Sequence, residues 1–581
     1  MNLSRLVFLF LSFPGPLLLC QPRIWSSAPY EQAIDSTSVT LVWRTLLPAD
    51  SRVRYGLTDS LELDEVYDST VTSQHVVPIV GLIPSTIYRV QFSSTDSIGT
   101  STGPLYTVST ASPSTSTGTI NVYFNKNVET SIATGQSALA NQRLDLRLID
   151  RIDSASYSID CALFSLSATP GDRIANALIA ARDRGVKVRV VMEASNSGSA
   201  PAGKLRNNEI TMVTDDFGSN SGAGLHHNKF FVFDYRDIRD STVSSAADDW
   251  VWTGSWNPTG AGTFSDFQDA IEIQDQALAG AFTREFEEMW GSETDTADAS
   301  RSKFGVRKTD NTPHVFAIAG RRVRLFFSPS DGTSTQINLT LGSADHSIAF
   351  ALLLITDNSL ADALVSKRQQ ELKVRGVIDD DDPTFGGDFN LLKQNGVDVL
   401  LDPNPGLLHH KYAIVDGEFA DSTPWVIVGS HNWTASADSK NDENTLLIQD
   451  AQIANLFLQE FAARYYEAGG QDSIVVPLRP RGGSIPTAFK LYQNFPNPFN
   501  PTTKISFELP RRSFVSLTVF NVLGEEVATL VSEEFAAGRY LTQWNASGIA
   551  SGVYFYRLVA EAVPSGQPGG FVQSKKLMLM R

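Results

Sequence analysis

The pattern of apolar and polar positions divides the chain into three stretches of different character. Between residues 24 and 112, short runs of alternating apolar and polar residues recur at 38–43, 51–56 and 87–92, with Pro and Gly between them. Strict alternation is the period of a β-strand that buries one face. We therefore expect an antiparallel β-sandwich in this first stretch.

The middle stretch, residues 120 to about 470, alternates strands with helices. Residues 174–181 have the spacing of an amphipathic helix, Gly185 follows, and 186–191 form an apolar run. A glycine that ends a helix just before an apolar strand is typical of an α/β unit. This stretch is expected to be an α/β domain.

An internal repeat runs through the middle stretch. The run at 158–163 recurs at 347–352, each beginning with Ser-Ile and ending with Ala-Leu. The separation is too large for a solenoid repeat. We expect two α/β halves, residues 120–300 and 315–469, related by a pseudo-twofold axis.

The last stretch, residues 488–581, is rich in strand patterns again, for example at 504–509 and 515–520. A second β-sandwich is expected there. Ser, Thr, Pro and Gly dominate residues 113–119 and 470–487, which predicts two flexible linkers.

The N-terminus has the pattern of a secretory signal. Arg5 precedes the apolar residues 6–19, a run shorter than the roughly 20 residues of a membrane span. We expect residues 1–20 to be a signal peptide, and simple export rather than lipid attachment at Cys20, because no small residue precedes it. Cys161, in an apolar run, is interpreted as a core residue.

The composition of the chain excludes few classes of protein. Of 581 residues, 42% are hydrophobic and 19% charged, which is ordinary for globular domains. The net charge of −17 argues against a protein that coats nucleic acid through bulk electrostatics. It leaves room for a small basic cleft on an acidic body.

Two copies of the motif H-x-K-x4-D stand in the two halves, and a G-S-x-N sequence follows each copy. The motif residues are His227, Lys229 and Asp234 in the first half and His409, Lys411 and Asp416 in the second. The G-S-x-N residues are Ser255 and Asn257, then Ser430 and Asn432. Corresponding residues of the two motifs are each 182 positions apart, so the copies match as units.

These residue types suit a phosphate site. On a strand, the His and Lys of H-x-K point to the same face, Asp ends the strand, and the G-S-x-N turn returns a hydroxyl and an amide to the same edge. Two facing edges would surround one phosphodiester with donors to its nonbridging oxygens. One imidazole can attack phosphorus while the other protonates the leaving oxygen.

Metal sites are the alternative for such residues. Closed zinc sites need about four ligands, and a lysine beside each histidine repels a cation. The acidic run at 379–382 lacks the ligand spacing of a calcium loop and is interpreted as a solvated loop. We expect no metal and no cofactor, and structural roles for His226 and His410.

Across residues 120–470, these motifs resemble the phospholipase D superfamily. The resemblance implies a covalent phosphohistidine intermediate, no metal, and an acidic residue after each G-S-x-N that orients a histidine. In the second half Glu443 fits this role, and we expect it to support His409. The first half departs, because Gln268 stands at the corresponding position, with Asp269 beside it.

The resemblance also suggests the division of labour. The N-terminal motif of the family usually supplies the nucleophile, which makes His227 the nucleophile and His409 the general acid and base. The departure at Gln268 leaves the reverse assignment open. Because one chain carries both motifs, a monomeric catalytic unit is expected.

The flanking stretches have resemblances of their own. Trp43, Tyr55 and Tyr88 are part of a pattern that resembles a fibronectin type III domain. Residues 491–501 and the end of the chain at 575–581 resemble the C-terminal sorting domain of the type IX secretion system. That resemblance implies passage across the outer membrane by the type IX machinery, with a carbohydrate-binding sandwich as the alternative.

The function expected from the sequence is that of a secreted phosphodiesterase located outside the cell or at its surface. Phospholipid is the first choice of substrate, giving phosphatidic acid and an alcohol. A metal-independent endonuclease acting on DNA or RNA is the alternative. A noncatalytic adhesin on the same fold is disfavoured because both motifs are intact.

Overall fold

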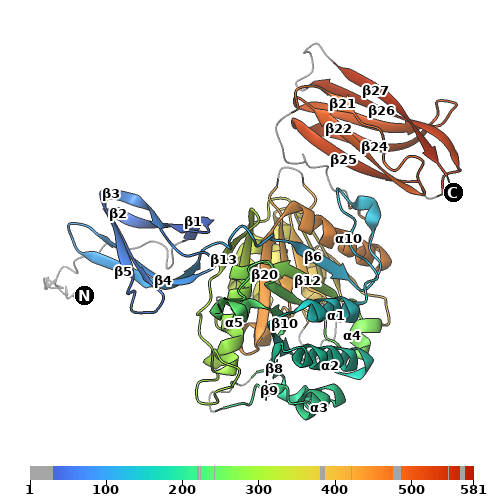
Figure 1. The fold of residues 1–581 in the computed structure, drawn as a ribbon. Helices are drawn as coiled ribbons and strands as arrows, with labels where there is room; N and C mark the ends of the chain where they lie inside the picture. The colour runs from blue at the N-terminus through green and yellow to red at the C-terminus, as the bar shows by residue number, and fades with distance from the viewer. Residues whose placement is uncertain are drawn as a thin grey trace, which may run out of the picture. The chain divides into compact units, whose positions relative to one another are not determined.

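The computed structural model describes residues 30–218, 222, 224–240, 242–379, 387–419, 422–474, 486–546, 548–562 and 570–580 (Figure 1). The expected signal peptide with Cys20, three aspartates of the acidic run (380–382) and residues 475–485 of the second linker lie outside them. The chain divides into two compact units, residues 1–111 and 112–581. No helix in the described ranges has both the length and the apolar character needed to cross a membrane.

The first unit is one connected antiparallel sheet. Its strands are β1 (Tyr30–Asp35), β2 (Ser38–Gly56), β3 (Asp64–Val80), β4 (Ile87–Thr95) and β5 (Thr100–Ser109). The order is β1-β2-β4-β5, and β3 also pairs with β2.

The separate strands expected at 38–43 and 51–56 are parts of the single strand β2. Its pairing with β3 shifts register between Arg44 and Ser51, and such irregularities let a strand bend without ending. β1 pairs with the first part of β2 and β4 with the second. Trp43 lies in the hydrophobic core of this unit.

The second unit begins with the first α/β half. Its strands are β6 (Ile120–Phe124), β7 (Ser158–Leu163), β8 (Lys187–Met192), β9 (Thr211–Thr214), β10 (Lys229–Phe233), β11 (Trp250–Gly254) and β12 (Asp269–Gln274). Its helices are α1 (Leu144–Ser154), α2 (Ala168–Asp183), α3 (Ala200–Asn207), α4 (Gly260–Phe264) and α5 (Gln276–Trp290). Short 3-10 turns are η1 (Thr130–Ile132), η2 (Ala194–Asn196), η3 (Tyr235–Arg239) and η4 (Gly305–Arg307).

The second half repeats this order after one extra strand. Its strands are β13 (Val315–Ile318), β14 (Arg321–Ser328), β15 (Ser347–Leu352), β16 (Lys373–Ile378), β17 (Asp398–Leu401), β18 (Lys411–Val415), β19 (Trp425–Gly429) and β20 (Glu443–Gln449). Its helices are α6 (Thr333–Gly342), α7 (Asn358–Gln369), α8 (Phe389–Gln394), α9 (Ala435–Ser439) and α10 (Ala451–Glu467).

The two sheets have the same topology. The first runs β6-β12-β11-β10-β7-β8-β9, and the second runs β13-β14-β20-β19-β18-β15-β16-β17. Strands β7 and β15 occupy equivalent places and coincide with the repeated runs at 158–163 and 347–352. The expected internal repeat is therefore confirmed, and with it two halves of mixed α/β sheet.

One hydrophobic core is shared by the two halves. It contains Phe230 of β10 and Phe282 of α5 together with Tyr412 of β18 and Phe457 of α10. Helices α1 to α3 and α6 to α8 contribute to separate outer cores, one in each half. Cys161 is a buried member of the first outer core, as the apolar run around it predicts. A common core fixes the two sheets against each other, which places the ends of β10 and β18 together.

Residues 112–119 make hydrogen bonds to the first α/β half. The Ser116 hydroxyl donates to the carbonyl of Ala246 over 2.8 Å, and the Ser112 hydroxyl accepts from the amide of Ala277 over 2.9 Å. The expected linker at 113–119 stays a prediction. Its small polar side chains bond to backbone at the start of α5 and beside β11.

The end of the chain is β-rich. Its strands are β21 (Lys490–Leu491), β22 (Thr502–Leu509), β23 (Ser513–Phe520), β24 (Glu526–Phe535), β25 (Gly538–Asn545), β26 (Gly552–Ala562) and β27 (Phe571–Leu579). They form one sheet ordered β21-β22-β25 and another ordered β24-β23-β26-β27, with one hydrophobic core between them.

Candidate active site

The His and Lys of each H-x-K motif lie at the start of a central strand. Lys229 and Lys411 are the first residues of β10 and β18, and His227 and His409 precede them by two positions. The histidine residues keep 6% and 9% of their surface exposed, and both lysines are buried. The four side chains thus form a nearly closed site that still reaches the surface.

Hydrogen bonds between the two halves bring the motifs together. The His227 amide donates to the carbonyl of Asp442 over 3.0 Å, and the His409 amide donates to the carbonyl of Phe267, also over 3.0 Å. Each motif is therefore tied to the segment that follows G-S-x-N in the opposite half. The pairing is reciprocal, as a pseudo-twofold relation requires.

Glu443 supports His227, not His409. The Nδ1 atom of His227 lies 2.8 Å from both Oε1 and Oε2 of Glu443, and the Ser430 hydroxyl donates to Oε2 over 2.8 Å. The expected pairing of Glu443 with His409 is wrong. The physical reason is the exchange of segments between halves, which carries Glu443 across to the first motif.

His409 has uncharged support. Its Nδ1 lies 3.0 Å from Oε1 of Gln268 and 3.1 Å from the carbonyl oxygen of Ser255. Both partners accept hydrogen bonds, so Nδ1 carries the proton and Nε2 is left for chemistry. Gln268, which stands where the family pattern has an acidic residue, is therefore the partner of His409.

The electrostatics of the site favour neutral imidazoles. Burial, followed by the charges of Lys229 and Lys411, holds the pKa of His227 well below its usual value. Burial and the same two lysines do the same to the pKa of His409. Burial also lowers the pKa of Lys411 to about 8, against the opposing charge of Glu443. An anion entering between the lysines would relieve this repulsion.

The Ser and Asn of each G-S-x-N behave differently. The Ser255 hydroxyl donates to Oε1 of Gln268 over 2.9 Å, as the Ser430 hydroxyl does to Glu443. Both serines are fully buried and hold the residue that orients a histidine, which differs from the direct phosphate contact expected of them. Asn257 and Asn432 each leave a buried amide oxygen without a hydrogen-bond partner among the described residues.

Asp234 and Asp416 lie at the far end of each strand from the histidine. Asp234 accepts from the amides of residues 156–158 at 2.7 to 3.1 Å. Asp416 accepts from those of residues 345–347 at 2.8 to 2.9 Å. Five strand residues at about 3.3 Å each separate them from the imidazoles. These contacts favour a structural role for Asp234 and Asp416 over the catalytic one expected from the motif.

His410 joins the two halves within the core. Its Nδ1 lies 2.7 Å from Asp269 of β12 and its Nε2 lies 3.1 Å from Glu460 of α10. Burial opposes a charge there, but Glu460 and Asp269 raise the pKa of His410 to about 9. A charged imidazole between two carboxylates agrees with the structural role expected for His410.

Comparison with known proteins agrees with this geometry. A family described as cardiolipin synthase, PLD-like domain, matches residues 148–290 and 337–465, one match in each half. A phospholipase D from Rickettsia typhi is 32% identical over 149 residues, which are 25% of this chain and 70% of that protein. The chain belongs to the phospholipase D family.

Two other proteins are similar to parts of the chain. A mitochondrial cardiolipin hydrolase from Canis lupus familiaris is 32% identical over 157 residues, 27% of this chain, and the chain spans 59% of its length. The structure of phosphatidylserine synthase from Haemophilus influenzae covers 60% of this chain and 86% of that one, at 13% identity with a TM-score of 0.41.

The C-terminal part matches a second family. Residues 493–564 match a secretion system C-terminal sorting domain. The expected type IX sorting domain is thereby confirmed, and it indicates delivery to the cell surface or the exterior. The matched residues lie outside both phospholipase D halves.

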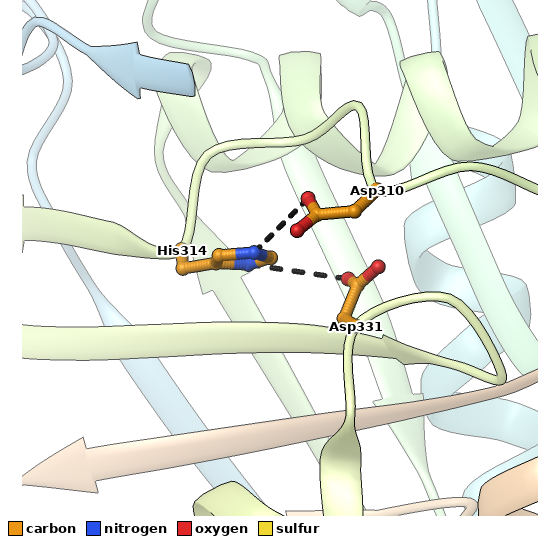
Figure 2. Close-up of side chains that lie close together, drawn as sticks. All are labelled: Asp310, His314 and Asp331. Carbon is orange, nitrogen blue, oxygen red and sulfur yellow. Dashed lines mark ion pairs between the residues drawn. The ribbon is translucent and has the colours of Figure 1, made fainter. Parts of the chain in front are cut away.

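A group of three possible metal ligands occurs in the described part of the chain, at sequence positions outside the two motifs. Asp310 and His314 precede β13, Asp331 follows β14, and their ligand atoms lie within 4.8 Å of one another (Figure 2). Nε2 of His314 is 3.1 Å from Asp310, and its Nδ1 is 3.0 Å from the carbonyl oxygen of Leu325. Burial opposes the charge, but the two aspartates raise the pKa of His314 to about 9. The imidazolium itself thus neutralises the carboxylates, and we assign the group to structure.

Several residues around the site carry no motif signal. The Thr253 hydroxyl donates to Oδ1 of Asn444 over 2.7 Å, and Nδ2 of Asn444 donates to Oδ1 of Asn228 over 2.9 Å. This chain of hydrogen bonds links the halves beneath the histidines. His431, the variable residue of the second G-S-x-N, is buried, and neither ring nitrogen has a partner among the described residues. Nothing in one copy of the sequence marks Thr253, Asn228 and Asn444, because their hydrogen-bond partners come from the other half.

Proposed function

We propose that this protein is a secreted phosphodiesterase that cleaves phospholipids to phosphatidic acid and an alcohol through a phosphohistidine on His227. The observation that carries the proposal is the bond between the Nδ1 of His227 and the carboxylate of Glu443. A carboxylate on Nδ1 fixes that proton, directs the Nε2 lone pair outward and stabilises the cation that forms on attack. His409, with neutral partners, has no such support.

The first chemical step is displacement of the alcohol. Nε2 of His227 forms a bond to phosphorus as the bond from phosphorus to the alcohol oxygen breaks. His409, protonated on Nε2 once the anionic substrate lies between the lysines, gives its proton to that oxygen. Lys229, Lys411 and the amides of Asn257 and Asn432 would hold the nonbridging oxygens.

The second step consumes water. His409, now neutral, takes a proton from a water molecule whose oxygen bonds to phosphorus. The bond from phosphorus to His227 breaks, which releases the phosphomonoester and restores both imidazoles. Ser255 and Ser430 position Gln268 and Glu443 and do not contact the phosphate in this scheme.

Side-by-side assays test the substrate class. We expect the purified protein to hydrolyse phosphatidylcholine vesicles in the presence of EDTA and to leave plasmid DNA intact. Nicking of the plasmid with no lipid hydrolysis would establish the endonuclease alternative. Complete loss of both activities in EDTA, restored by zinc, would overturn the metal-free mechanism.

A substrate whose leaving group requires no proton distinguishes the roles of the two histidines. With a p-nitrophenyl phosphodiester, His409→Ala should still form the phosphoenzyme, while His227→Ala should not. A general acid contributes roughly 10²–10⁴-fold, so rescue by the activated substrate is measurable. Mass spectrometry after a quench that avoids acid locates the phosphoryl group. Finding it on His409 would reverse the assignment.

A further inference from the structure

The mouth of the active site carries exposed apolar side chains. Leu225 and Leu407 each stand two residues before a motif histidine, and they keep 43% and 47% of their surface exposed. Phe264, the last residue of α4, is 49% exposed. Single exposed apolar residues are common on proteins, but these two leucines and one phenylalanine are gathered at the opening of one site.

Backbone contacts place the three residues at this mouth. The Leu225 carbonyl accepts from the Asp442 amide over 2.9 Å, and the Leu407 carbonyl accepts from the Phe267 amide over 2.8 Å. These are the same exchanged segments that hold the histidines. The segment with Phe264 runs beside the segment with Leu407, because a β-carbon added to Gly406 would lie 2.2 Å from the carbonyl oxygen of Ser265.

Cations accompany the apolar side chains. The Arg143 guanidinium lies 4.9 Å from the Phe264 ring centroid, and the Lys126 ammonium donates to the Phe264 carbonyl over 2.9 Å. On the Leu225 side, a β-carbon added to Gly224 would lie 2.1 Å from the carbonyl oxygen of the exposed Lys440. Arg143 also pairs with the buried Asp145, which Arg173 shares, so these three side chains keep one net positive charge. The mouth is therefore apolar and basic on a chain whose net charge is −17.

We propose that this mouth, formed by Leu225, Leu407, Phe264, Lys126, Arg143 and Lys440, docks on the surface of a phospholipid bilayer. The proposal deepens the proposed function and rests on it for the substrate. Leucine and phenylalanine side chains enter the boundary between headgroups and acyl chains, while the cations meet lipid phosphates. The phosphodiester headgroup of a lipid would then reach His227 while the acyl chains of that lipid stay in the bilayer.

A nucleic acid fits this surface less well. Backbone phosphates are bound by cations and bases by aromatic stacking. The cations and Phe264 could serve both, but the exposed Leu225 and Leu407 would stay in water against a nucleic acid. The position of the leucines on both sides of the pseudo-twofold axis suits a flat apolar surface that covers the whole mouth.

Two assays separate membrane docking from chemistry: vesicle binding tests the docking surface, and hydrolysis of a soluble substrate tests the active site. The test protein is the full chain with Leu225→Ser and Leu407→Ser together, or with Phe264→Ser. The matched control is Ile238→Ser, an apolar residue 38% exposed on η3 after β10, at the strand end opposite His227. Binding is measured by cosedimentation with vesicles of phosphatidylcholine and phosphatidylglycerol, and chemistry with bis(p-nitrophenyl) phosphate.

We expect the double variant to bind vesicles roughly ten-fold or more weakly, because two large side chains no longer leave water. Its hydrolysis of the soluble diester should stay within about two-fold of the wild type, which also shows that it folds, and Ile238→Ser should match the wild type in both assays. Equal vesicle binding by wild type and double variant would overturn the docking surface. If vesicle binding falls as expected while the wild type hydrolyses no lipid, the docking surface stands and the proposed lipid substrate fails.

Discussion

The Nδ1 atom of His227 lies 2.8 Å from both carboxylate oxygens of Glu443, a residue 216 positions away in the chain and in the other half of the repeat. The equivalent atom of His409 meets the uncharged side chain of Gln268. The two imidazoles therefore have equivalent positions and different electrostatic support. This difference is the physical basis for giving them different roles.

Exchanging the supporting residues should separate the two chemical steps. Glu443→Gln removes the charge that stabilises the His227 cation, so formation of the phosphoenzyme should slow by roughly 10²-fold or more. Gln268→Glu adds a charge beside His409, should raise the pKa of that imidazole, and should move the pH optimum upward. Rapid-quench labelling with a p-nitrophenyl diester measures the first effect, and a pH–rate profile measures the second. Normal labelling of Glu443→Gln with slowed dephosphorylation would contradict the assignment.

The loss of activity at alkaline pH should follow the deprotonation of Lys411. Burial lowers the pKa of this amine to about 8, so its charge is present below that pH and is lost as the pH rises through it. Activity should decline over the same range, because the phosphate loses a cation. Lys411→Arg keeps its charge at every accessible pH and should move the alkaline limb upward, even though the larger side chain lowers the rate. Lys440→Arg, at an exposed lysine, is the control. If the alkaline limb of the pH–rate profile is unchanged in Lys411→Arg, another group is responsible for that limb.

Asp416 should matter for stability and not for chemistry. Asp416→Ala leaves the amides of residues 345–347 without their acceptor, and the expected loss is about 3 kcal/mol of unfolding free energy. Asp416→Asn keeps one acceptor oxygen and should lose less. Chemical denaturation measures the loss, and kcat per folded molecule should remain near that of the wild type. A large fall in kcat without loss of stability would return Asp416 to the catalytic machinery.

The sequence alone predicted much of the fold and the identity of the reacting groups. Local patterns are enough for elements such as α2 and β8, because apolar period and a terminal glycine depend on neighbours in the chain. The repeat of 158–163 at 347–352 predicted two halves of one design. The spacing of H-x-K was enough to name His227, Lys229, His409 and Lys411 as a group, since period-two alternation is a local property of a strand.

Only the tertiary structure decided which residue supports which histidine. The sequence places Glu443 near His409 and Gln268 near His227, but a hydrogen bond depends on distance in space, and the halves exchange the segments after G-S-x-N. The far ends of β10 and β18 likewise separate Asp234 and Asp416 from the chemistry, although both belong to the motif. The mouth residues Leu225 and Leu407 are ordinary leucines in the sequence. They become a surface because a shared core holds the two halves together and leaves those side chains in solvent.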